Sequence, residues 1–328
     1  MTPFHRAAQR LLWAQTALND PLFKLESASS DASFRSYWRG YSEGRTWIVM
    51  DAPPDKEDTG PWLAMARRLT DAGLHAPEIR AVDEENGFVL MSDLGVRLFL
   101  PELNERTADE LYGQALDALL QMQTRLPSQD LPAYDEQRLT AEMELMPTWF
   151  FERHLGFTPS CEQWDVIELA FRKLLDSAGR QTHAFVHRDY HSRNLLISES
   201  GQPGILDFQD AVHGPITYDL VSLLRDCYIA WPDDRVEAWV EAYRQRAETA
   251  GLATGSPAQF LQAFDLMGLQ RHIKVLGIFC RLYYRDGKSG YLGDLPLVWE
   301  YTRRIGRKYP ETAPLIELIE HAIGTRDI

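Results

Sequence analysis

The sequence predicts an α+β protein with a small β-rich N-terminal part and a larger, mainly helical C-terminal part. Over the first hundred positions, short runs of β-branched and aromatic residues alternate with turn residues. Apolar residues then recur every three or four positions over most of the remaining chain, which is the spacing of amphipathic helices. A few short β-like runs interrupt this helical part.

The first part reads as three strands, a helix and two strands. The expected strands span 24–28, 34–39, 47–51, 79–82 and 88–91. The expected helix spans 62–72, with Pro61 at its start and Gly73 as its stop. A turn at 92–95 closes this part, so we expect one domain over 1–94 and a second over 95–328.

The second part carries seven helical patterns and one interruption. The patterns cover 107–125, 136–154, 162–178, 218–230, 233–250, 257–284 and 295–308. Thr107 and Glu110 have the spacing of a capping box, and we expect a kink at Pro147. The β-like runs at 184–186, 195–198 and 205–208 form the interruption.

Composition and charge exclude several classes of protein. The 328 residues include 48 acidic and 34 basic side chains, for a formal net charge of −14, which disfavours broad binding to nucleic acid or anionic lipid. No run approaches the roughly 18 apolar residues that span a bilayer, and the N-terminus lacks the apolar core of a secretory signal. The three cysteines, Cys161, Cys227 and Cys280, fit reduced thiols. We therefore expect a cytoplasmic protein with no nucleic-acid, membrane or obligate protein partner.

The interruption carries the candidate chemistry. It begins His187-Arg188-Asp189-Tyr190-His191-Ser192-Arg193-Asn194. If the runs on either side of Ser200-Gly201 form a hairpin closed by these two residues, Asn194 lies opposite Asp207. Neighbouring amide and carboxylate oxygens suit Mg²⁺, although a slip of one residue would separate them. Asp189, just outside the hairpin, would accept the proton of an attacking hydroxyl, as phosphoryl transfer requires.

These motifs resemble those of kinases. His187-Arg188-Asp189 with Asn194 resembles the catalytic loop of protein kinases, and Asp207-Phe208 resembles the start of their metal-binding motif, with Gln209 in place of the glycine. Gly214-Pro215 and Asp219-Leu220 follow too soon for a long activation segment. This ending resembles the aminoglycoside phosphotransferase and choline kinase superfamily, which phosphorylates small molecules on a bilobal protein-kinase-like fold.

The resemblance covers nearly the whole chain and implies roles for particular residues. ATP would be the phosphoryl donor and Mg²⁺ the cofactor, held by Asn194 and Asp207. Asp189 would be the catalytic base, and His187 and Asp219 would support the catalytic loop.

A finer resemblance concerns the acceptor. The segments 30–35, 50–54, 206–218 and 271–277 resemble those of the anomeric N-acetylmuramate/N-acetylglucosamine kinases. These bacterial enzymes recycle peptidoglycan sugars by phosphorylating the C1 hydroxyl with ATP. The resemblance therefore implies a small amino-sugar substrate.

Nucleotide contacts are expected at two places in the first part. The phosphate loop would join the first two strands at Ser29, Ser30, Asp31, Ala32 and Ser33, although ordinary turn chemistry explains the same residues. The adenine would meet the backbone between Met91 and Leu94.

One departure from the kinase pattern concerns the third strand. A protein kinase has a lysine about where Met50 stands. Arg35, Arg39 and Lys56 are the nearby cations that could supply the missing charge, and the sequence does not choose among them.

Basic and polar residues of the second part are candidates for sugar binding. Arg271 and Lys274 share a helical face, and this pair could bind the lactyl carboxylate of N-acetylmuramate. A solvated face paired with surface carboxylates explains the same spacing equally well. Further candidates for contact with the sugar are Arg193, Gln209, Asp210 and Arg225.

Three other functions fit parts of the sequence. A kinase of an aminoglycoside or of choline would share every catalytic residue. A nucleotide-binding pseudokinase scaffold would account for the missing strand lysine. A metal hydrolase could use His187, Asp189 and His191 as zinc ligands, but the charges of Arg188 and Arg193 beside them argue against it.

Overall fold

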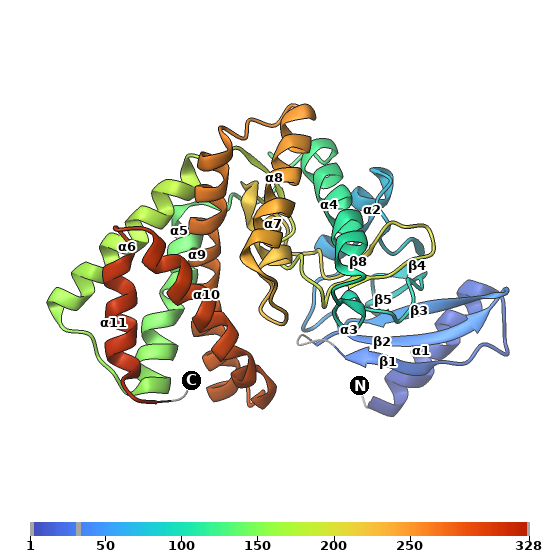
Figure 1. The fold of residues 1–328 in the computed structure, drawn as a ribbon. Helices are drawn as coiled ribbons and strands as arrows, with labels where there is room; N and C mark the ends of the chain where they lie inside the picture. The colour runs from blue at the N-terminus through green and yellow to red at the C-terminus, as the bar shows by residue number, and fades with distance from the viewer. Residues whose placement is uncertain (1–2, 31–33, 327–328) are drawn as a thin grey trace. The chain divides into compact units, whose positions relative to one another are not determined.

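The computed structural model describes residues 3–30 and 34–326 (Figure 1). The chain divides into two compact units, which are described separately. Unit 1 comprises Met1–Glu102 and Asn194–Asp210, and unit 2 comprises Leu103–Arg193 and Ala211–Ile328. The sequence predicted a single division after residue 94, whereas the segment Asn194–Asp210 belongs to unit 1 in the structure.

Unit 1 is built on a five-stranded antiparallel sheet with the order β1-β2-β3-β5-β4. The strands are β1 (Glu26–Ser30), β2 (Ser36–Ser42), β3 (Arg45–Asp51), β4 (Ile79–Asp83) and β5 (Phe88–Ser92). The turn between β2 and β3 has two residues, Glu43 and Gly44, with φ of 53° and 77°. Two positive φ angles match the twist of the paired strands and fix their register.

A helix that the sequence analysis did not predict packs on this sheet. The helix α1 (Pro3–Leu18) lies beside the sheet (Figure 1). Its Ala14 and Leu18 are buried in one cluster with Trp47, Val49 and Leu90. Two arginines of α1 also bind the end of β3, since Arg6 Nε and Arg10 Nη1 lie 2.7 and 2.6 Å from the Asp51 carboxylate. The helix is therefore an integral part of unit 1.

The remaining elements of unit 1 are helices and a short hairpin. They are α2 (Gly60–Asp71), α3 (Phe99–Glu102), β7 (Leu195–Leu196) and β8 (Gly204–Ile205). The helix α2 confirms the helix expected over 62–72, and its Trp62 ring lies 5.3 Å from that of Phe208. Hydrogen bonds from Ile197 N–H to Arg97 O and from Ile205 N–H to His75 O join the hairpin to this unit.

Unit 2 is mainly helical. Its helices are α4 (Ala108–Arg125), α5 (Glu136–Met143), η1 (Met146–Leu155), α6 (Cys161–Gly179), α7 (Thr217–Leu224), α8 (Asp233–Thr249), α9 (Pro257–Tyr284), η2 (Ser289–Asp294), α10 (Leu295–Lys308) and α11 (Ala313–Ile323). The strands β6 (His183–Val186) and β9 (Val212–Pro215) pair antiparallel. The kink expected near Pro147 is a break between α5 and the π-helix η1, α7 ends six residues earlier than predicted, and α11 was not predicted.

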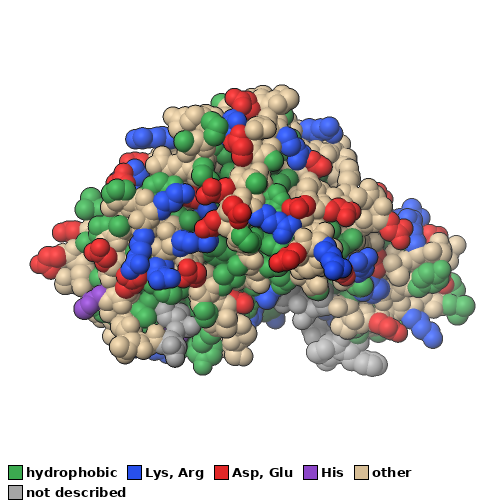
Figure 2. All heavy atoms as spheres, in the orientation of Figure 1, with side chains coloured by type: hydrophobic (Ala, Val, Ile, Leu, Met, Phe, Trp, Pro, Cys, Tyr) green, Lys and Arg blue, Asp and Glu red, His purple; other side chains and the backbone are tan. Residues whose placement is uncertain are grey.

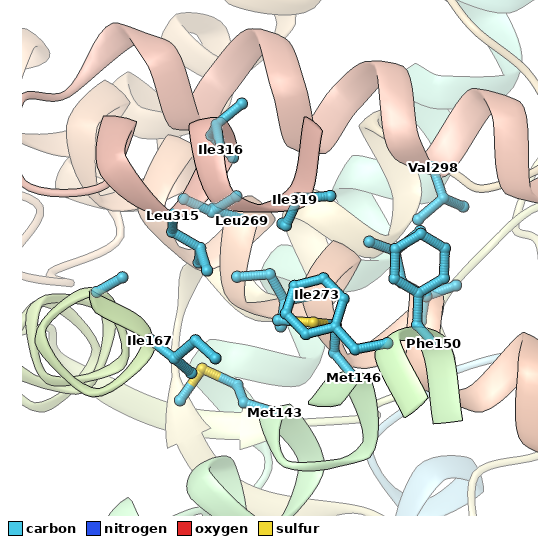
Figure 3. Packing of buried hydrophobic residues seen from close by; sticks show 14 of the residues in the cluster. Met143, Met146, Phe150, Ile167, Leu269, Ile273, Val298, Leu315, Ile316 and Ile319 are labelled. Atoms are coloured by element: carbon cyan, nitrogen blue, oxygen red, sulfur yellow. The ribbon is translucent and has the colours of Figure 1, made fainter. Parts of the chain in front are cut away.

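The helix α9 runs through the core of unit 2. Every residue from 264 to 277 is buried, as expected for a helix covered on all sides. Figure 3 shows Leu269 and Ile273 of this helix among apolar side chains from α5, η1, α6, α10 and α11. A Cβ on Gly277 would lie 2.3 Å from the carbonyl carbon of Leu145, so only glycine allows the close approach of these backbones.

The surface carries both charges. Figure 2 shows acidic and basic side chains intermingled on one face, with no large area of a single sign. Across residues 3–30 and 34–326, no helix has the length and apolar content needed to cross a bilayer.

Candidate active site

A buried carboxylate positions the loop that follows β6 in unit 2. Asp219, at the start of α7, accepts the backbone N–H of His187 at 2.6 Å and that of Arg188 at 2.9 Å. Arg188 has a φ of 78°, a conformation that non-glycine residues adopt only when their surroundings enforce it. The structure thus brings the predicted supporting residues together, through the backbone N–H of His187.

Asp189 follows in the same loop and is half-buried. Its N–H donates to His187 Nδ1 at 3.3 Å. Burial alone would raise the pKa of Asp189, but the positive charges of Lys274, His191 and Arg271 outweigh it, so the pKa lies below its usual value. The Asp189 side chain is therefore a carboxylate at neutral pH.

Lys274 is the cation that lowers the pKa of Asp189 most. It is held by Glu142, a residue that the sequence analysis did not single out. Lys274 Nζ lies 2.9 Å from Glu142 Oε1 and donates to the Tyr218 hydroxyl at 3.0 Å. The same carboxylate binds Arg188 Nη2 at 2.5 Å and the Tyr134 hydroxyl at 2.5 Å. Glu142 therefore connects α5, the catalytic loop and α9.

The signal for Glu142 was present in the sequence. Its spacing from Leu139 and its place beside Met143 put it on the buried face of α5. An acidic side chain on such a face needs a cationic partner.

The basic face of α9 is not a solvated stripe, because its charges are inside unit 2. Arg271 is 5% exposed and donates to the Cys227 sulfur at 3.3 Å, and Lys274 is 9% exposed. The alternative of a solvated face paired with surface carboxylates is therefore wrong, whereas contact of Arg271 and Lys274 with the sugar stays a prediction. The cause is the position of α9 in the core, which helical spacing alone does not reveal.

Arg225 also lies in the interior. Its guanidinium is 2.7 Å from Asp265 Oδ1, and both side chains are buried. Its contact with the sugar stays a prediction, and the structure shows that its charge is balanced by Asp265. Arg193 is different, because it is partly exposed and its guanidinium lies 3.4 Å from the centre of the Tyr228 ring and 3.9 Å from Asp294.

In unit 1 the hairpin that contains Asn194 and Asp207 differs by one residue from its predicted register. Leu195 pairs with Ile205, and Leu206 N–H donates to Asn194 O at 3.0 Å. Asn194 is therefore opposite Leu206, and the prediction that it faces Asp207 is wrong.

The segment that joins the two strands accounts for the slip. Seven residues, 197–203, lie between β7 and β8, so the hairpin is not closed by the assumed two-residue turn. At the other end, Asp207 has a φ of 61°, and the ladder stops there. The two side chains remain at the same end of the hairpin, but strand pairing does not align them.

Asp207 has two polar neighbours in unit 1. Gln209 Nε2 donates to Asp207 Oδ1 at 2.9 Å, and Arg35 Nη2 lies 3.7 Å from the same oxygen. Gln209 in turn lies 3.4 Å from Asp210, whose side chain is exposed. An exposed carboxylate edge with a nearby amide offers the oxygen ligands that Mg²⁺ takes in proteins.

The expected nucleotide contacts are described only in part. Ser29 and Ser30 form the end of β1, and Asp31, Ala32 and Ser33 lie outside the described residues. Met91 is buried in β5, which lies between β3 and β4. The Leu94 side chain is close to Gly204, because a Cβ added to this glycine would lie 3.3 Å from it. Ser92 N–H is already bonded to Glu78 O at 2.9 Å.

The rival zinc cluster does not form. Among the residues that the structure describes, no three His, Cys, Asp or Glu side chains are grouped to hold a metal ion. His187, Asp189 and His191 therefore do not converge as a hydrolase would require.

Comparison with known proteins places the chain in a family. The profile described as "Phosphotransferase enzyme family" matches residues 24–258. The chain belongs to the phosphotransferase enzyme family. The match includes the catalytic loop, both residues of the expected metal site and Asp219.

Three relatives of this phosphotransferase carry the name N-acetylmuramate/N-acetylglucosamine kinase. The Pseudomonas aeruginosa protein is 47% identical over 300 residues, covering 91% of this chain and 88% of its own. The Pseudomonas putida protein is 44% identical and the Neisseria meningitidis protein 39% identical, each covering 96% of both chains.

Solved structures confirm the predicted kinase-like α+β fold. An ADP-bound aminoglycoside phosphotransferase has a TM-score of 0.61 at 15% identity and covers 91% of this phosphotransferase and 98% of its own chain. A choline/ethanolamine kinase family protein from Mesorhizobium loti has a TM-score of 0.60 at 14% identity and covers 95% and 99%. At such identities, these structures establish the fold alone.

Proposed function

We propose that this phosphotransferase transfers the γ-phosphoryl group of ATP to the anomeric hydroxyl of N-acetylmuramate and N-acetylglucosamine. The observation that carries the proposal is the identity of 39–47% to proteins named as kinases of these two sugars, over nearly the whole chain. Peptidoglycan recycling in the cytoplasm is the role we infer for such an activity.

Asp189 is the proposed base. Its low pKa keeps the carboxylate ionised, so it can accept the proton of the C1 hydroxyl as the sugar oxygen bonds to the γ-phosphorus. The bond between that phosphorus and the oxygen bridging to the β-phosphate breaks, and ADP leaves. Asp219 supports this role by holding the backbone of the loop in a strained conformation.

Asn194 and Asp207 are the proposed ligands of Mg²⁺. A carboxylate and an amide are suitable donors, and the ion would neutralise charge on the phosphates. Asp207 is 37% exposed on its side chain, which leaves an edge for a ligand. Gln209 orients this carboxylate through its hydrogen bond and is better placed for that role than for sugar binding.

Residues for the two substrates follow from the remaining predictions. We propose that the segment of Ser29, Ser30, Asp31, Ala32 and Ser33 covers the phosphates and that the adenine lies against the backbone between Met91 and Leu94. Arg193 and Asp210 stay candidates for the sugar because both side chains are exposed. Arg271 and Lys274 also stay candidates for the sugar, and their positive charges lower the pKa of Asp189.

The acceptor can be tested by ADP release from Mg·ATP. We expect release with N-acetylmuramate and N-acetylglucosamine, but not with choline, an aminoglycoside or the methyl glycoside of N-acetylglucosamine. The methyl glycoside is the matched control because it blocks only the anomeric hydroxyl. Equal release with it would place the phosphate on another hydroxyl, and release with choline alone would reject the sugar.

A further inference from the structure

The third strand of unit 1 has no cation where protein kinases have a lysine. Met50 stands at that place in β3, fully buried. Its partner across the sheet is Tyr37 of β2, and Ser36 faces Asp51. Arg35 comes immediately before these two β2 residues, so its backbone lies beside the end of β3.

Arg35 and Met50 line the same pocket in unit 1, which has a volume of about 270 Å³. Arg35, Met50 and Ala52 line it together with Gln209 and Asp210. Among the described residues that line this pocket, Arg35 supplies the positive charge, and its guanidinium is 3.7 Å from Asp207. The cation is thus next to the proposed metal ligand although it comes from the segment before β2 and not from β3.

Two acidic residues that line the pocket accept hydrogen bonds from backbone N–H groups. Glu57 Oε1 accepts the N–H of Phe34 at 2.9 Å, and Asp58 Oδ1 accepts that of Gly60 at 2.8 Å. These bonds hold the rim of the pocket at the start of α2. Phosphates entering such a rim need a cation, and a guanidinium binds their oxygens in a bidentate manner.

The two other cations named by the sequence do not line this pocket. Arg39 makes hydrogen bonds of 2.6 and 3.0 Å to the Asp93 carboxylate and another to Gly95 O. The Lys56 ammonium lies 4.6 Å from the centre of the Phe34 ring, and Lys56 does not line the pocket. The geometry therefore distinguishes Arg35 from both.

We propose that Arg35 binds the phosphate groups of the nucleotide and thereby replaces the strand lysine of protein kinases. The inference rests on the proposed function, because it assumes that ATP is the donor. It assigns the charge to the residue that immediately precedes β2, so the strand position of Met50 is free to be apolar.

Isothermal titration with Mg·ADP and with adenosine tests the assignment. In Arg35→Met, we expect ADP binding to weaken by about 10- to 100-fold, as for the loss of a charge-assisted contact, and adenosine binding to stay unchanged. Arg35→Lys should keep most of the affinity for ADP. Lys56→Met is the matched control, and its ADP affinity should equal that of the wild type.

Two results would overturn the proposal. One is a folded Arg35→Met protein that binds ADP within twofold of the wild type. The other is an equal loss of ADP and adenosine, which would make Arg35 a structural residue. A wild type that binds Mg·ADP but phosphorylates no amino sugar would instead reject the acceptor, and the test of Arg35 would stand because it measures binding alone.

Discussion

The carboxylate of Asp219 accepts the backbone N–H of His187 at 2.6 Å, inside unit 2 and away from water. The same carboxylate binds the next N–H along the chain, so one buried side chain determines the path of the loop just before Asp189. The position of the proposed base therefore depends on a residue 30 positions later in the sequence.

Replacement of this side chain should change how stability depends on pH. Burial raises the pKa of Asp219 to about 7 in the folded protein, from 3.8. The folded state then binds the proton more tightly than the unfolded chain, so the contribution of Asp219 to stability is full below about pH 4 and is lost as the pH rises to about 7.

Asp219→Asn removes this titration. We expect urea denaturation to show a free energy of unfolding that falls less steeply between pH 4 and 7 in the variant than in the wild type. Equal slopes would contradict the assignment of this pKa.

Lys274→Met should move the acid limb of the pH profile of kcat. Activity requires the Asp189 carboxylate, which is present above its pKa and lost as the pH falls through it. Lys274 is the strongest charge holding that pKa down, so its loss should shift the limb to higher pH. Measurement of kcat between pH 4 and 8 checks this, and an unchanged limb would exclude Lys274 as a partner of Asp189.

Glu142→Gln should destabilise unit 2. The substitution leaves the Lys274 and Arg188 cations without their shared carboxylate, and breaking such a buried pair costs about 3–5 kcal/mol. Chemical denaturation measures the loss. Glu144→Gln, on an exposed residue next to the same helix, is the matched control and should change stability by less than about 0.5 kcal/mol.

Two glycine substitutions should have opposite signs. Gly277→Ala forces a Cβ into the backbone of Leu145 and should cost about 1–3 kcal/mol or more. Gly113→Ala, within α4 and with no atom within 4 Å of the new Cβ, should stabilise by about 0.5–1 kcal/mol. Thermal denaturation compares them, and a stabilising Gly277→Ala would refute the close packing of α9.

The strands of unit 1 could be predicted because turn residues bound each one. Glu43 and Gly44 are of this kind, since their conformation closes the β2–β3 hairpin. The helix α1 could not be placed in the same way. It is stabilised by Trp47 and Asp51, which are distant in sequence, so its place on the sheet is not visible in its own spacing.

At the candidate site, residue types could be predicted but their surroundings could not. Asp189 and Asp219 were recognisable from local motifs. The register at Asn194 depends on the length of the connection between β7 and β8, and the burial of Lys274 depends on the helices around α9. Neither is contained in local spacing.

The most direct test of the account is ³¹P NMR of the products formed from Mg·ATP and N-acetylmuramate by the wild type and by Asp189→Asn. We expect a sugar phosphate at the anomeric position from the wild type. The variant should bind Mg·ADP normally and form the product about 10²- to 10⁴-fold more slowly, because it lacks the base. Phosphate on another hydroxyl, or undiminished turnover in the variant, would contradict the proposed transfer to C1 with Asp189 as its base.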